Sequence, residues 1–137
     1  MRFRVTMNER QAKLVIKALD LYSRLGGGQI EEIERFLRDQ LVSGKGIASR
    51  LSVKKLMVLR EYIGPIKRHV LALRPGESLG ITSGEAADWT RECYDVQRVI
   101  QNGVAWAEMP EGGSQVWFDD VDRLGSEPLP EFEVVES

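Results

Sequence analysis

Three consecutive glycines, Gly26-Gly27-Gly28, stand between two stretches whose apolar residues recur every three or four positions. Such recurrence places apolar side chains on one face of a helix. Glycine adopts the left-handed conformation that ends a helix at little steric cost. The sequence therefore predicts a helical hairpin, with one helix over about residues 8–25 and a second over about residues 29–42.

Two more helices are expected after the hairpin. Ser52 is the predicted N-cap of a third helix, which should break or kink at Gly64-Pro65 and continue from there. Ser83 is expected to open a fourth helix that extends to about Ala107. For the first helix, either Thr6 with Glu9 or Asn8 is expected to form the cap. The residues expected to face inward in the third and fourth helices are Leu56, Leu59, Ile63, Ile66, Val70 and Leu73, then Trp89, Cys93, Val96 and Ile100.

Short alternating or apolar runs predict three strands, over residues 2–6, 115–118 and 132–135, that we expect to pair. The predicted fold class is α+β, mainly α, with the helical hairpin, a long helix in the C-terminal half and a small antiparallel sheet. A chain of 137 residues has the length of a single domain, 1–137, whose last few residues are expected to be disordered.

The net charge of −2 conceals an asymmetry between the two halves of the chain. Residues 1–75 hold 16 Lys and Arg against 7 Asp and Glu, a balance of +9. Residues 76–137 hold 3 against 14, a balance of −11. This asymmetry predicts either an anion-binding surface with an acidic tail, or mutual attraction of the halves within one chain or between subunits.

The residues that most enzymes and metal sites depend on are scarce. Cys93 is the only cysteine and His69 the only histidine, so a disulfide within the chain is excluded and a zinc site is not expected. Cys93 shares a helix face with apolar residues and is interpreted as a core residue. We therefore predict no catalytic residue, no cofactor and no enzyme. No signal peptide or membrane span is evident either, so we expect a cytoplasmic protein.

Three further patterns have an ordinary interpretation beside a functional one. The three glycines precede a helix, as in phosphate-binding loops, but without a nucleotide motif a plain connector is favoured. Three aspartates, at 119, 120 and 122, fail the spacing of a calcium loop and are interpreted as turn residues. A basic run forms either a solvated helix face or a phosphate-binding face. It comprises Lys54, Lys55, Arg60, Lys67, Arg68 and Arg74.

Polar residues on the predicted fourth helix form the strongest candidate for a binding site. They are spaced by four, three and one positions and so share one side of the helix. The set is Tyr94, Arg98, Gln101 and Asn102. An aromatic ring, a guanidinium and two amides can stack on a base, bind a phosphate and donate hydrogen bonds. The alternative is an ordinary exposed helix face.

Two stretches resemble a family of small, mostly uncharacterised bacteriophage proteins. The first is residues 18–29 with Glu31-Glu32, which contain Leu21-Tyr22-Ser23-Arg24 and Gly28-Gln29. The second is residues 94–100, continuing to Ala105-Trp106 and 110–113. The pattern is also similar to phage Thoeris anti-defence sponges, which are helical oligomers that sequester cyclic ADP-ribose-type signals without cleaving them.

That resemblance implies a function and a site. The expected function is phage counter-defence in the cytoplasm of an infected bacterium, by sequestering a small cyclic-nucleotide or ADP-ribose-derived signal. Tyr22, Arg24, Gln29 and the polar side of the fourth helix would converge at an interface of a homo-oligomer. A protein inhibitor of a host defence complex, or a nucleic-acid-binding protein using the basic run, are the alternatives. Nucleic acid is the less favoured partner, and no membrane partner is expected.

Overall fold

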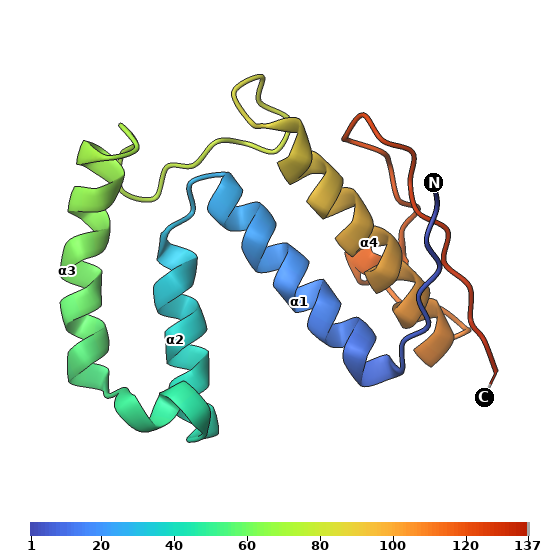
Figure 1. The fold of residues 1–137 in the computed structure, drawn as a ribbon, viewed down its shortest axis with the longest axis horizontal. Helices are drawn as coiled ribbons and strands as arrows, with labels where there is room; N and C mark the ends of the chain where they lie inside the picture. The colour runs from blue at the N-terminus through green and yellow to red at the C-terminus, as the bar shows by residue number, and fades with distance from the viewer. Residues whose placement is uncertain (137) are drawn as a thin grey trace. The chain divides into compact units, whose positions relative to one another are not determined.

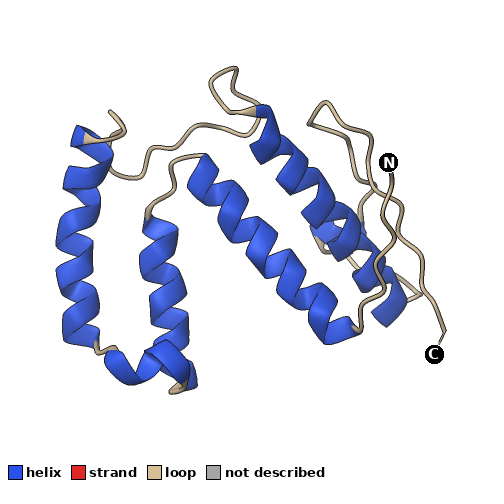
Figure 2. Ribbon diagram, viewed as in Figure 1, coloured by secondary structure: helices blue, strands red, loops and turns tan. Residues whose placement is uncertain are grey.

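A computed structural model describes residues 1–136, and within them the protein is built from helices joined by loops (Figures 1 and 2). Helices make up 57% of the structure and strands 0%. The α-helices are α1 (Glu9–Gly26), α2 (Glu31–Ser43), α3 (Val53–His69) and α4 (Asp88–Glu108). Two short 3₁₀ helices are η1 (Gly46–Arg50) and η2 (Val116–Phe118).

The predicted antiparallel sheet is wrong, because none of its three strands is formed among the described residues. Residues 2–6 have no regular structure, and Phe3 and Val5 are mostly exposed rather than covered on one face. Residues 116–118 form η2, and 132–135 have no regular structure. Side chains of α4 hydrogen-bond the backbone around η2, so that segment has no need of a neighbouring strand.

The chain forms two compact units. The terminal unit comprises residues 1–23 and the described residues from Ala86 onward, so it holds most of α1, all of α4 and the C-terminal loop. The central unit is Arg24–Glu85, with α2, η1 and α3. Whether both belong to one domain stays a prediction.

The cap of α1 is Asn8, and not Thr6. The side-chain oxygen of Asn8 accepts the backbone N–H of Gln11, and the side-chain oxygen of Gln11 accepts the backbone N–H of Asn8, each at 2.9 Å. This reciprocal pair satisfies two backbone groups at the helix start. At the other end the chain turns through Gly28, whose φ is +81° and which lies against Leu73 so closely that a Cβ would meet its side chain at 2.7 Å.

In the central unit α2 and α3 run side by side (Figure 1), and charged side chains lie in their contact. Leu56 and Ile63 of α3 are buried as predicted. Glu34 of α2 is buried as well, and it pairs with Arg38 and with Arg60, the latter at 2.9 Å. Lys67 of α3 is fully buried, and its ammonium donates to Glu31 at 2.6 Å and to the backbone carbonyl of Glu77.

Two of the three predicted inward positions after Pro65, Ile66 and Val70, are wrong, whereas Leu73 is half-buried. Val70 is 73% exposed and Ile66 is 38% exposed, whereas Lys67 faces inward. The prediction assumed that the helix restarts at Pro65, but α3 is continuous from Val53 to His69. Its inward face therefore stays in phase with Leu56 and Ile63, which brings position 67 to the same side. Ser52 is confirmed as the cap, because its hydroxyl accepts the N–H of Lys55 at 3.2 Å.

The start of α4 lies five residues later than predicted. Ser83 does not cap a helix; its hydroxyl accepts the N–H of Glu85 in a local turn, and α4 begins at Asp88. Trp89, which was expected to be buried, is 41% exposed, while Cys93, Val96 and Ile100 are half-buried. The buried side of α4 carries Thr90, Asp95, Gln97, Arg98 and Ala105.

Candidate functional site

The polar side of α4 is covered by the chain itself. Arg98 is only 8% exposed, and its guanidinium donates to the carbonyl of Val116 at 2.9 Å and to the side-chain oxygen of Gln101 at 3.4 Å. The amide of Asn102 donates to the carbonyls of Trp117 and Asp119 at 2.8 and 2.9 Å. Three of the four side chains predicted to bind a ligand on this helix thus take part in contacts inside the terminal unit.

A carboxylate of α4 binds the other end of the loop that contains Val116 and Asp119. Asp95 is 3% exposed and accepts the backbone N–H groups of Leu124, at 3.0 Å, and Gly125, at 2.8 Å. Asp88 accepts the hydroxyl of Ser126. Side chains of α4 thus hold residues 116–126, which we call the anchored segment. Most of these contacts are hydrogen bonds between a side chain of α4 and the backbone of the segment. Such bonds satisfy buried backbone groups in the absence of a sheet.

Asp95 and Asp88 were missed as partners of this segment, although a pattern in the sequence marks them. Asp88, Asp95 and Asn102 recur every seven residues, which places them on one side of a helix. A polar stripe of this kind opposite an apolar stripe is also typical of a solvated face. Only the position of the anchored segment shows that this stripe binds another part of the chain and does not face solvent.

Residues Arg24 and Gln29, predicted for the same site, lie in the central unit and contact each other. Nη1 of Arg24 donates to the side-chain oxygen of Gln29 at 3.3 Å and lies 3.8 Å from the carboxylate of Glu32. Glu32 also pairs with Arg35, at 3.3 Å. The guanidinium of Arg24 therefore has a carboxylate of its own unit beside it. Tyr22 and Tyr94 belong to the terminal unit, where Tyr94 is half-buried.

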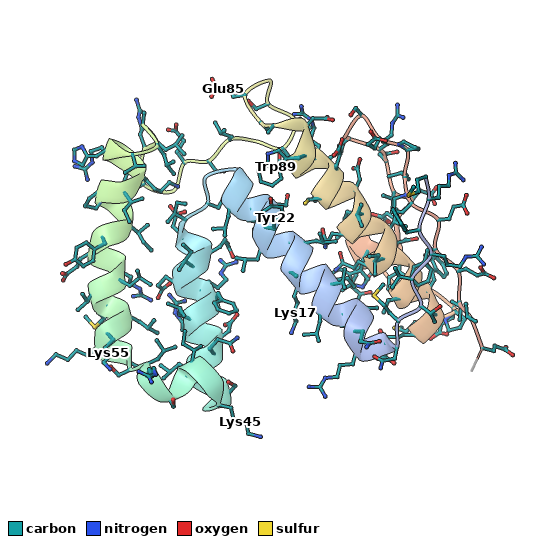
Figure 3. The ribbon with its side chains drawn as sticks, viewed as in Figure 1. Lys17, Tyr22, Lys45, Lys55, Glu85 and Trp89 are labelled. Carbon is teal, nitrogen blue, oxygen red and sulfur yellow. The ribbon has the colours of Figure 1, made fainter. Side chains whose placement is uncertain are left out.

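Tyr22 of α1 and Trp89 of α4 form an aromatic pair on the surface of the terminal unit, and Figure 3 shows the two side chains next to each other. The ring centroids are 4.7 Å apart with the planes tilted by 32°. Tyr22 is 57% and Trp89 is 41% exposed. Ser23 follows Tyr22 in α1, and Thr90 follows Trp89 in α4. The hydroxyl of Ser23 donates to the backbone carbonyl of Thr90 at 3.1 Å in a buried contact, and this bond holds the two rings together.

The basic run on α3 is partly used inside the central unit. Arg60 pairs with Glu34, Lys67 pairs with Glu31, and Lys55 donates to the carbonyl of Arg50 at 3.0 Å. The guanidinium of Arg38, helped by Arg60 and opposed by burial, lowers the pKa of Glu34. Burial acts to raise the pKa of Glu31, but Lys67 and the N–H of Gly76 lower it overall.

A hollow of about 460 Å³ lies beside the second half of α4, and its volume is within the range of small ligand sites. Its lining is mostly apolar and includes Val99, Trp106, Val121, Phe132 and Val134, with Asp120 among them. A second hollow, of about 590 Å³, lies along the first half of α1. There the ammonium of Lys13 donates hydrogen bonds to Glu108 and Glu9, and these bonds raise the pKa of Lys13 to about 12.

The thiol of Cys93 is half-buried, and burial followed by the charge of Glu92 raises its pKa. A raised pKa disfavours the thiolate that a nucleophile needs. Within residues 1–136 no cluster of three or more His, Cys, Asp or Glu side chains is placed to hold a metal ion. None of the helices in that range has both the length and the apolar character needed to cross a membrane.

Comparison of the chain with known protein families, with curated proteins and with solved structures finds no match. The resemblance to bacteriophage proteins therefore stays a prediction from the two sequence stretches.

Proposed function

We propose that this protein is a phage counter-defence protein that binds a small cyclic-nucleotide or ADP-ribose-derived signal and holds it without cleaving it. The observation that carries the proposal is the aromatic pair Tyr22–Trp89, together with the resemblance of the stretch around Tyr22 to phage proteins. Two exposed aromatic faces held at a fixed angle suit the stacking of a nucleobase, which contributes about 1–3 kcal/mol per base.

The role of the other predicted residues changes in this proposal. Arg98 and Asn102 donate to backbone carbonyls, so we assign them to anchoring and not to the ligand. The phosphates of the ligand would then be bound by cationic side chains of a second copy, as expected for a site at a subunit interface. The central unit supplies such groups, since it has 11 Lys and Arg against 7 Asp and Glu.

Calorimetry with cyclic ADP-ribose isomers and cyclic oligonucleotides tests the proposal. We expect one of them to bind wild-type protein, and Trp89→Ala to weaken that binding at least tenfold by removing a stacking face. Trp117→Ala is the matched control, because Trp117 is 38% exposed and lies outside the pair. The absence of heat with every compound, or equal weakening in both variants, would contradict the proposal.

The second candidate is a protein inhibitor of a host defence complex. The exposed acidic residues of the C-terminal loop favour it, because a run of carboxylates can imitate the charge of nucleic acid. They are Asp119, Asp120, Asp122, Glu131 and Glu133. Recovery of one host protein in a pull-down, lost when Asp119 and Asp120 are changed to Asn, without nucleotide binding by the wild type, would favour this candidate.

A further inference from the structure

We propose that the protein self-associates by placing the outer face of α3 of one copy in the hollow beside α4 of another copy. This inference concerns assembly and goes beyond the proposed function, because it needs no ligand. It rests on an apolar hollow with an acidic edge in the terminal unit and on an apolar stripe with a basic edge in the central unit.

The hollow beside α4 is formed in part by the ring of Phe132, which lies against Gly103. At Gly103 of α4 a Cβ would be 2.2 Å from the ring of Phe132, so the absence of a side chain lets Phe132 lie against the helix. Trp106, Phe132 and Val134 line the hollow and are 43%, 40% and 63% exposed. Exposed apolar side chains gathered in one concave place are typical of a docking site.

One carboxylate lies in this apolar lining and others are close to it in the sequence, among them Glu131, which is 3.9 Å from the guanidinium of Arg2. Asp120 is part of the lining itself. Glu131 and Glu133 flank Phe132 in the sequence and are exposed, and so are Asp119 and Asp122. The terminal unit as a whole holds 8 Lys and Arg against 14 Asp and Glu, a balance of −6. The hollow with its carboxylates, the acidic groove, therefore favours an occupant that is both apolar and basic.

The outer face of α3 has that character. Val58, Tyr62 and Ile66 are spaced by four residues and are 48%, 61% and 38% exposed, on a side of the helix away from Leu56 and Ile63. Lys54 and Lys55, four and three positions before Val58, are exposed beside this outer stripe. An amphipathic helix whose apolar residues step by four is the form that binds in a hydrophobic groove.

Charge identifies the occupant as a second copy of this chain. The central unit has a balance of +4 and the terminal unit one of −6, so the two surfaces attract, and every copy presents both. Because the surfaces are unlike, each contact uses the helix of one copy and the groove of another. Closed assemblies from a dimer upward then leave neither surface uncovered.

A mixing experiment under reducing conditions tests the contact by sedimentation velocity. Tyr62→Glu disables the helix but leaves the groove, and Val134→Glu disables the groove but leaves the helix. We expect wild-type protein to assemble as its concentration rises and each variant alone to be monomeric. An equimolar mixture of the two variants should form a 1:1 heterodimer, because one intact contact remains. Heterodimer formation also shows that both variants are folded.

Val42→Glu is the matched control, since Val42 is 88% exposed and lies on α2, outside both surfaces. It should assemble like the wild type, and 0.5 M salt should weaken assembly at least tenfold by screening the charges. Wild-type protein that stays monomeric at 100 μM, as it would if α3 occupied its own groove or another protein did, overturns the inference. So does a mixture that stays monomeric while the wild type assembles.

Discussion

Asp95 receives two backbone N–H groups in a position that is almost closed to solvent. A buried N–H that loses its acceptor costs about 1–3 kcal/mol, which is more than a typical hydrogen bond contributes on its own. The carboxylate therefore matters chiefly because its loss would leave the N–H groups of Leu124 and Gly125 without their acceptor if the anchored segment kept its position.

Asp95→Ala should accordingly destabilise the terminal unit by about 2–3 kcal/mol. We also expect it to make the anchored segment accessible to proteases, which cleave released chain in preference to held chain. Urea unfolding and limited proteolysis measure the two effects. Asp122→Ala removes an exposed carboxylate of the same loop and should change neither. Equal effects of the two substitutions would show that Asp95 has no special role.

The substitution Gly103→Ala gives a second test at the residue scale, because its effect on stability should depend on whether Phe132 is present. In the wild type, Gly103→Ala places a methyl group 2.2 Å from the ring of Phe132 and must displace it. In a Phe132→Ala background the same change should stabilise the protein by about 1 kcal/mol, since alanine is the better helix former.

A double-mutant cycle followed by urea unfolding measures this coupling. We expect Gly103→Ala to be neutral or destabilising when Phe132 is present and stabilising when it is absent. If it stabilised both backgrounds equally, Phe132 would not lie on α4 as described.

At the scale of elements, the pairing of α2 with α3 depends on carboxylates. Glu34 is buried between the helices, and its lowered pKa means that the folded state favours the ionised form. A group with a lowered folded pKa stabilises the fold above its ordinary value, here 4.5, and loses that contribution as pH falls towards the lowered value.

Glu34→Gln should therefore destabilise the central unit by about 1–2 kcal/mol at pH 7, after allowance for the half-exposed arginines. Below pH 4.5 the difference from the wild type should shrink, because the wild type is also losing its charge. Thermal unfolding between pH 3 and 7 measures it. Glu61→Gln, at an exposed position of α3, is the control, and a difference that grew on acidification would contradict the assignment.

The two helices of the hairpin and the start of α3 followed from local chemistry, whereas the start of α4 did not. Both helices of the hairpin were predicted to within about two residues at each end, and Ser52 was identified as a cap, because periodicity and capping act within a few residues. The sheet was wrong because an apolar run such as Val116-Trp117-Phe118 fits a strand equally well until its hydrogen-bond partners are known. Those partners come from α4, 12 to 18 residues away.

The candidate site could be predicted only in part, for a related reason. Periodicity places Tyr94, Arg98 and Asn102 on a common side of α4, but it does not say what covers that side. Arg98 has the same spacing whether it binds a phosphate or the carbonyl of Val116. Trp89 was assigned to the buried stripe from its spacing alone, whereas its exposure beside Tyr22 depends on the position of α1.

For the whole molecule, the opposite net charges of its two units connect the proposals. The basic central unit would supply cations for a negatively charged ligand, and in our inference it also presents the helix that the acidic groove of another copy receives. Assembly and ligand binding can be measured separately, because one needs no ligand and the other is read from the aromatic pair.

The central claim is that the protein holds a nucleotide signal and leaves it chemically intact. Mass spectrometry of the small molecules released on heating protein that was first exposed to bacterial defence signals, then washed, tests it most directly. We predict an unmodified nucleotide from the wild type and from Trp117→Ala, and little or none from Trp89→Ala. Recovery of a cleaved product, or of no nucleotide from the wild type, would contradict the claim.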